Sequence, residues 1–197
     1  MPQGTLTALS IQEIRALEDA VERELKRIAV QDGIAPSEAE LVVRDILPET
    51  DLNAVSGEVW VTHTSAYAWN TVFSGELPEN KAFAIYGVTT AIETMISGAS
   101  LRYIGANVSG YPASKVLPSV VAIKFGLGAG PAKIKDIWHI QHMYTVDPPR
   151  VYSKSPIVYR KKEKFTIQVY GTQSMADHII LLGKVVEPKG QTILGGS

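Results

Sequence analysis

The chain of 197 residues contains no cysteine. This absence excludes disulfide bonds, thiolate metal sites and cysteine nucleophiles. Long apolar runs are also missing, because no stretch approaches the ~20 apolar residues that a helix needs to cross a bilayer. The first residues, Met1 to Gly4, lack the basic start and apolar run of a secretory signal. We therefore expect a soluble protein that is made in the cytoplasm.

The sequence also lacks the common catalytic motifs. No G-x-S-x-G nucleophile elbow is present, and no H-x-H pair supplies the ligands of a cupin-like β-barrel oxygenase. The glycine-rich run from Gly126 to Lys133 does not have the G-x-x-x-x-G-K-[ST] spacing of a phosphate-binding loop. A flexible hairpin connection is the simpler interpretation of this run. We therefore expect neither enzyme activity nor a cofactor.

Two histidines are the best candidates for a metal site. His139 and His142 would share one face of a helix, but their odd spacing places them on opposite faces of a strand. Their apolar neighbours Ile137, Trp138 and Ile140 favour a strand. No acid nearby completes the usual set of ligands. We therefore predict no metal site here.

What the chain does contain is enough apolar material for one packed core. Hydrophobic residues make up 45% and charged residues 20% of the chain, which is the composition of a folded protein rather than a disordered one. One domain is expected at this length. We divide it into an N-terminal helical arm, residues 1–50, and a β domain, residues 51–197.

The clearest predicted element is a helix from Ser10 to about Val30. Ser10 and Glu13 match the S-x-x-E capping box, in which the two side chains satisfy otherwise unpaired backbone N–H groups. Gly33 is well placed to end the helix. Apolar side chains recur every three or four residues and form one stripe, which must be buried against the β domain or a neighbouring subunit. This stripe consists of Ile14, Leu17, Val21, Leu25 and Ile28. In a chain that assembles in many copies, we expect these residues to form the interface between subunits.

Residues 36–48 allow two interpretations. Ser37 with Glu40 could cap a second short helix. The apolar run from Leu41 to Val43 and the segment from Asp45 to Pro48 fit a strand better. The sequence leaves this segment open between helix and strand.

From about Gly57 the hydrophobic period changes to two, which is typical of strands. Clusters of glycine and proline separate the segments. About eight strands in about 130 residues predict an antiparallel β-sandwich or barrel of the jelly-roll type, because the helices that a parallel sheet requires are missing. The expected strands are Glu58–Thr64, Lys81–Val88, Ser100–Gly105, Ser119–Phe125, Lys133–Met143, Ile157–Tyr159, Phe165–Tyr170 and Ile179–Val186.

The net charge of −1 hides an uneven distribution along the chain. Residues 1–100 carry 15 acids and 6 bases, and residues 101–197 carry 5 acids and 13 bases. Such polarity either favours head-to-tail contact between copies or directs one face at a polyanion. An ordinary surface with unevenly spread charge is the alternative.

A basic run between two predicted strands is the candidate for contact with a polyanion such as nucleic acid. The alternative is the solvated turn of a hairpin that links Ile157–Tyr159 to Phe165–Tyr170. The bases of this run are Arg160, Lys161, Lys162 and Lys164.

The C-terminal third carries a resemblance to a known group of proteins. It reads Ser155 to Tyr159, a charged turn, Phe165 to Gly171, a polar loop and then Asp177 to Gly190. This strand pair closing on a short tail, with an amphipathic helix ahead of eight strands, resembles single jelly-roll capsid proteins of tailless viruses of archaea and thermophilic bacteria. The resemblance implies a self-assembling coat subunit of the virion, assembled in the host cytoplasm, without catalysis, cofactor or small-molecule substrate.

One departure from this group concerns partners. Many capsid subunits have a basic N-terminal arm for the genome, whereas residues 1–50 carry 10 acids and 5 bases. The arm therefore suits contacts between subunits, or a shell that lies over a membrane or another inner layer. We expect many copies of the chain and other virion proteins as partners, and contact with nucleic acid or membrane stays open.

Two other functions compete with the coat subunit. The first is a β-sandwich module that binds carbohydrate or another ligand, as in host attachment, through an aromatic platform. The second is a metal-dependent β-barrel enzyme built on His139 and His142. The candidate platform residues, which fit a core equally well, are Trp60, Tyr67, Trp69 and Tyr111.

Overall fold

The computed structural model describes residues 6–55, 57, 59–60, 62–90, 120–128, 133–146, 149–172 and 174–190. Within them lie two α-helices, two short 3-10 helices and eleven strands. The helices are α1 (Ile11–Gln31), η1 (Glu38–Glu40), α2 (Pro48–Leu52) and η2 (Gln141–Thr145). The strands are β1 (Leu6–Thr7), β2 (Leu41–Asp45), β3 (Thr62–Thr64), β4 (Ala68–Glu76), β5 (Ala82–Thr90), β6 (Val120–Leu127), β7 (Lys133–His139), β8 (Arg150–Tyr159), β9 (Lys164–Gly171), β10 (Met175–Asp177) and β11 (Ile179–Pro188).

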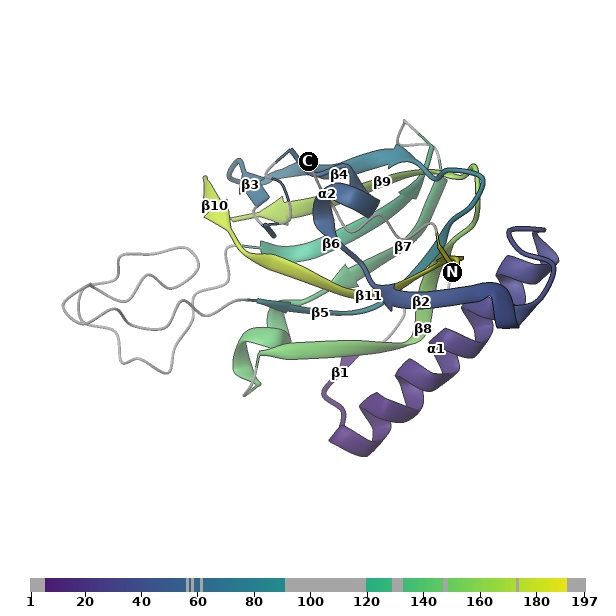
Figure 1. Ribbon diagram of the computed structural model, residues 1–197. Helices are drawn as coiled ribbons and strands as arrows, with labels where there is room; N and C mark the ends of the chain where they lie inside the picture. Colours follow the sequence, from purple (N-terminus) through teal and green to yellow (C-terminus); the bar gives the residue numbers. More distant parts are fainter. Residues whose placement is uncertain are drawn as a thin grey trace.

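Two antiparallel sheets face each other (Figure 1). The first has the order β1-β8-β5-β11-β2 and the second the order β4-β9-β6-β7, while β3 and β10 form a separate short pair. We call the first the helix-side sheet and the second the open-side sheet. The prediction of a mainly β, antiparallel sandwich preceded by an amphipathic helix is confirmed.

The strand order is that of a jelly roll. Without the three shortest strands, the pairs are β2 with β11, β4 with β9, β5 with β8 and β6 with β7. These are the pairs of one long hairpin, four strands out and four strands back. Two further pairs, β11 with β5 and β9 with β6, appear when this hairpin is rolled up. Rolling of this kind produces the two packed sheets of the jelly-roll architecture.

Aromatic side chains fill the space between the two sheets. Phe83 of the helix-side sheet contacts Tyr159 and Phe165, with ring centroids 5.0 and 5.4 Å apart. The Tyr159 hydroxyl donates a hydrogen bond to the Gly126 carbonyl of the open-side sheet at 3.1 Å. This bond satisfies a polar group that burial would otherwise leave unpaired.

Helix α1 packs on the outer face of the helix-side sheet (Figure 1). The predicted capping box is present, because Ser10 and Glu13 each accept a backbone hydrogen bond from the other residue. The helix covers two small residues of β5, Ala82 and Ala84, which are almost fully buried. Nearby, the Tyr86 hydroxyl donates to Glu18 at 3.0 Å. Strand β5 is therefore buried on both faces.

A glycine on β11 permits the close packing of β11 against β2 and β5. A Cβ atom at Gly183 would lie 2.6 Å from the carbonyl oxygen of Ala84 and would also overlap Ile46. The register of β11 against β5 shifts at this same point. Glycine is the residue that allows such an approach of two backbones.

Several predicted boundaries differ from the structure. Residues 36–48 contain η1, then β2, and then the start of α2. The strand interpretation is correct for Leu41–Asp45, whereas a single 3-10 turn precedes it and the Ser37 side chain makes no capping hydrogen bond. The predicted strand Lys133–Met143 ends at His139, and η2 follows. Within the predicted strand Glu58–Thr64, the described strand is Thr62–Thr64, while residues 58 and 61 lie outside the described part. The predicted strand Ser100–Gly105 lies outside the described residues.

Strand β4 and the first seven residues of β8, 150–156, were not predicted. The register of β4 shifts between Thr71 and Phe73, and that of β8 shifts opposite Ile85 and Gly87. Such bulges break the period of two on which the prediction rests. In addition, β2 lies in the segment assigned to the helical arm but pairs with β11. The arm and the β domain therefore share one sheet.

Candidate functional site

The apolar stripe of α1 faces the chain's own sheet. Val21, Leu25 and Ile28 are 0–3% exposed, and Ile14 and Leu17 are half-buried against the same cluster. The three buried residues are already covered within one chain, which corrects their assignment to contacts between subunits. Ile11, at the start of the helix, is 72% exposed and lies outside this contact.

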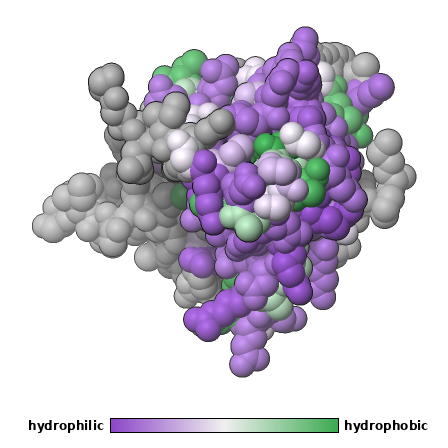
Figure 2. Space-filling view, turned by 45° about the vertical axis from the view of Figure 1, so that its right-hand side comes forward, coloured by the Kyte–Doolittle hydropathy of each residue, from purple (hydrophilic) through white to green (hydrophobic). Residues whose placement is uncertain are grey.

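An apolar groove remains beside the helix. Its volume is about 370 Å³. Among the coloured residues of the face shown in Figure 2, most are hydrophilic and the hydrophobic ones form small patches. The groove is lined by Leu17, Ala20, Val21, Glu24, Leu25, Ala84, Lys154, Pro156 and Val158.

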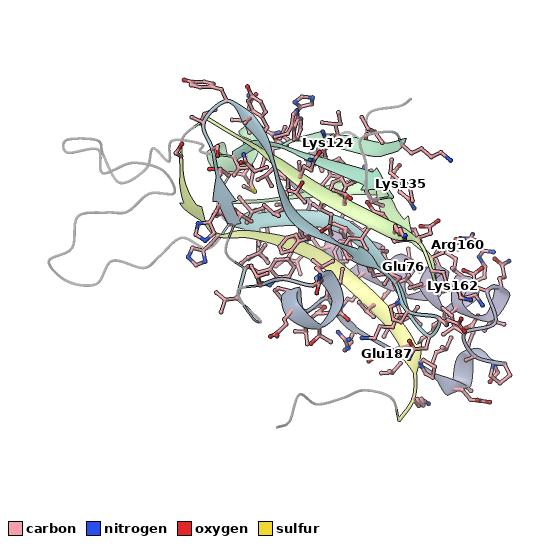
Figure 3. All side chains as sticks on the ribbon, turned by 90° about the horizontal axis from the view of Figure 1, so that it is seen from above. Glu76, Lys124, Lys135, Arg160, Lys162 and Glu187 are labelled. Carbon is pink, nitrogen blue, oxygen red and sulfur yellow. The ribbon has the colours of Figure 1, made fainter. Side chains whose placement is uncertain are left out.

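Three of the four bases of the basic run pair with acids of the same chain. Arg160 lies 3.3 Å from Asp32, Lys162 lies 2.5 Å from Glu79, and Lys164 lies 3.6 Å from Glu76. Figure 3 shows that Glu76, Arg160 and Lys162 lie at the same end of the molecule. Paired acids reduce the positive potential that a polyanion would meet, so this geometry disfavours the predicted polyanion contact.

The run also does not close a hairpin. It connects β8 of the helix-side sheet to β9 of the open-side sheet, and these strands belong to different sheets. The turn residue Lys162 has a left-handed backbone (φ 61°). The prediction of a solvated turn is correct, and the prediction of a hairpin is wrong because the next strand pairs in the opposite layer.

Acids from the first half of the sequence form ion pairs with bases from the second half in the folded chain. In a rolled hairpin, strands of the first half lie beside strands of the second half. Acids of the first half therefore meet bases of the second half, as in Asp45 with Lys184 at 2.7 Å and Glu76 with Lys164 at 3.6 Å. These contacts are made within one chain, so they remove part of the reason to expect head-to-tail attraction between copies.

The most elaborate polar cluster was missed by the sequence analysis. Arg44 of β2 donates to Asp51 at 2.6 and 2.8 Å and to Glu187 of β11 at 2.9 Å. The Lys81 ammonium lies 3.1 Å from Asp51 and 3.3 Å from Glu187. Asp51 also accepts a hydrogen bond from the Leu47 N–H at 2.8 Å. Two cations thus balance two buried anions.

The carboxylates of this buried charge cluster are paired with cations of the same chain, as in a site that serves the structure. Burial alone would raise the pKa of the Asp51 carboxyl. Hydrogen bonds from Arg44 and Leu47, with the nearby charge of Lys81, nevertheless hold this pKa below its ordinary value of 3.8. The carboxyl is therefore ionised and fully engaged at neutral pH. The sequence indicated this cluster only by a charged residue within each of two apolar strands, Arg44 in β2 and Glu187 in β11.

The two histidines do not assemble a metal site. His139 ends β7 and His142 lies in η2, and both side chains are exposed. Across the residues that the structure describes, no group of three histidine, aspartate or glutamate side chains is placed to hold a metal ion. Of the glycine-rich run, Gly126 and Leu127 belong to β6 and Lys133 begins β7, while residues 129–132 lie outside the described part.

The four aromatic candidates separate into different environments. Trp60 packs edge-on against Phe73 of the core, with ring centroids 5.8 Å apart. Tyr67 and Trp69, at the start of β4, are 76% and 37% exposed. Tyr111 lies outside the described residues. The structure thus keeps two of the four as surface aromatics.

Trp69 belongs to a small cluster on the open-side sheet. The Tyr170 ring of β9 contacts it edge-on, at 5.5 Å between centroids. The Lys124 ammonium of β6 lies over the indole, 4.4 Å from its centroid, in a cation–π contact. In Figure 3, Lys124 lies on the opposite side of the molecule from Glu187. This cluster is therefore remote from the buried charge cluster.

No described helix has both the length and the apolar composition needed to cross a membrane.

Comparisons with known proteins identify no relative of the chain. No family model, curated protein or solved structure matches the chain.

Proposed function

We propose that the chain is a coat subunit of a virus shell, which assembles in many copies and performs no catalysis. The observation that carries this proposal is the strand order, in which all four pairs of a rolled eight-stranded hairpin are present. Viral capsid proteins are one of the principal users of jelly rolls, together with lectins and cupins. In this proposal the chain resides in the virion, beside other virion proteins.

A rigid body suits this function. The helix, the two sheets and the buried charge cluster are joined by packing and ion pairs within one chain. A subunit of this kind keeps its shape while it meets neighbours in a repeated geometry. The exposed side chain of Ile11, at the start of α1, is then one candidate contact between subunits.

The first experiment is a measurement of mass. The purified full chain is studied by light scattering and then by electron microscopy. The proposal expects closed particles or large regular oligomers. A monomer that persists at high protein concentration contradicts the coat function.

Deleting residues 1–33 would not be an informative test, because α1 covers the chain's own core. A surface substitution is sharper. Ile11→Glu places a negative charge at the first turn of α1, where the helix dipole favours it, so the fold is retained. If this end of the helix makes subunit contacts, Ile11→Glu dissociates the assembly. Gln12→Glu adds the same charge next to it without removing an apolar group and should assemble normally.

A ligand-binding module is the second candidate function. It is favoured by one observation, the two exposed aromatic residues at the start of β4. In this case the purified chain is a stable monomer that binds a ligand at these residues.

A further inference from the structure

Tyr67 occupies an unfavourable position in the fold. Its backbone is left-handed (φ 54°), a conformation that glycine or asparagine adopts far more readily than a bulky residue. Its side chain is 76% exposed, so burial of the ring does not offset this strain. Backbone strain of this kind is typical of functional sites. An exposed ring on a left-handed backbone does not stabilise the fold, so stability does not account for a tyrosine at this position.

The loop that carries Tyr67 is held by hydrogen bonds. The Tyr67 N–H donates to the Gly171 carbonyl at 2.7 Å. The Asn70 side chain accepts from the Ser65 N–H at 2.9 Å and donates to the carbonyls of Ser65 and Ala68 at 3.3 and 2.9 Å. The exposed ring therefore extends from an ordered support.

The ring of Trp69, two residues later, is held by contacts with two other side chains. The Lys124 ammonium lies over the indole and the Tyr170 ring forms an edge-type contact with it, yet 37% of the residue remains exposed. On the adjacent part of the sheet, the Gln168 side chain donates to the Thr71 hydroxyl at 3.0 Å. The Gln168 carboxamide oxygen and the Thr71 hydroxyl proton remain suited to hydroxyl groups of a ligand.

We propose that Tyr67 and Trp69 form a binding site for a glycan. Aromatic rings present a negative face, which attracts the slightly positive C–H groups on the apolar face of a sugar ring. The Tyr67 backbone and the Trp69 ring are already held in place, so less entropy is lost when the ligand binds than for two mobile residues. The site does not depend on the coat function, because it uses the surface of a single chain.

The charge around the site favours a glycan over single-stranded nucleic acid, which also stacks on aromatic rings. Nucleic acid binding requires a row of cations along the phosphates. Among the residues that the structure describes, Lys124 is the cation that contacts this cluster, and it is engaged with the Trp69 ring. The basic run lies in another part of the molecule and pairs with acids (Figure 3).

The test begins with the purified full chain on a glycan array, followed by titration with the glycans that bind. Trp69→Ala and Tyr67→Asn should each weaken binding by about tenfold or more. Asparagine tolerates the left-handed backbone, so Tyr67→Asn should leave the melting temperature unchanged or higher. Tyr67→Phe keeps the ring and should retain binding.

Ile134→Ala is the matched control. Ile134 lies on β7 of the same sheet and is 38% exposed, close to the exposure of Trp69. This variant should bind as the unchanged chain does. The proposal is overturned if no glycan binds at millimolar concentration, or if Tyr67→Asn and Trp69→Ala bind normally. Preferential binding of a single-stranded oligonucleotide at these residues would also overturn it.

Discussion

The two sheets use their outer faces differently. Strand β5 of the helix-side sheet is buried on both faces, because α1 covers Ala82 and Ala84. Strand β9 of the open-side sheet begins with the exposed Lys164 and then alternates between buried and half-buried residues from Phe165 to Gly171. An unbroken apolar strand thus indicates a covering element, whereas alternation indicates a face left for solvent or a ligand. The following predictions test this difference.

The largest effect is expected where the helix-side sheet buries charge. Arg44→Met removes one of two cations and leaves Asp51 and Glu187 with Lys81 alone. An uncompensated buried charge should cost about 3–5 kcal/mol in the free energy of unfolding, measured with urea. Combining Arg44→Met with Glu187→Gln restores neutrality and should recover part of the loss. Equal losses in the single and double variants would refute the charge balance.

Next in size is the contact between α1 and its sheet. Leu25 is fully buried there, so Leu25→Ala should lower the free energy of unfolding by about 2–5 kcal/mol. Ile11→Ala removes a similar apolar side chain from the exposed end of the same helix. This variant should change the free energy of unfolding by less than about 0.5 kcal/mol. Similar values for both variants would mean that α1 does not pack as a fixed layer.

Acid should weaken the same sheet through Asp51. The pKa of this carboxyl is lower in the folded chain than its ordinary value of 3.8, so the folded state holds the ionised form more strongly than the unfolded state. The resulting stability is present above pH 3.8 and is lost as the pH falls through the folded pKa. Urea titrations between pH 6 and pH 2 should show this loss, reduced in Asp51→Asn. A fall already between pH 6 and pH 5 would point to other groups.

The sequence predicted elements where local patterns were regular. The capping box at Ser10 and the apolar stripe predicted helix α1, and the hydrophobic period of two predicted most strands of the open-side sheet. It did not predict what the stripe contacts, because an apolar face looks the same whether its partner is the same chain or another. The buried charge cluster was also invisible, because Arg44 and Glu187 are 143 residues apart and meet only when the hairpin is rolled.

The smallest effect is expected on the open-side sheet, where Trp69 contacts only Tyr170 and Lys124 among the aromatic and cationic groups of the described surface. Trp69→Ala should therefore lower the free energy of unfolding by about 1 kcal/mol, the value of one aromatic contact. Phe73→Ala, on the buried face of the same strand, should cost about 3–5 kcal/mol. If Trp69→Ala is as costly as Phe73→Ala, the indole belongs to the core and the two outer faces are alike.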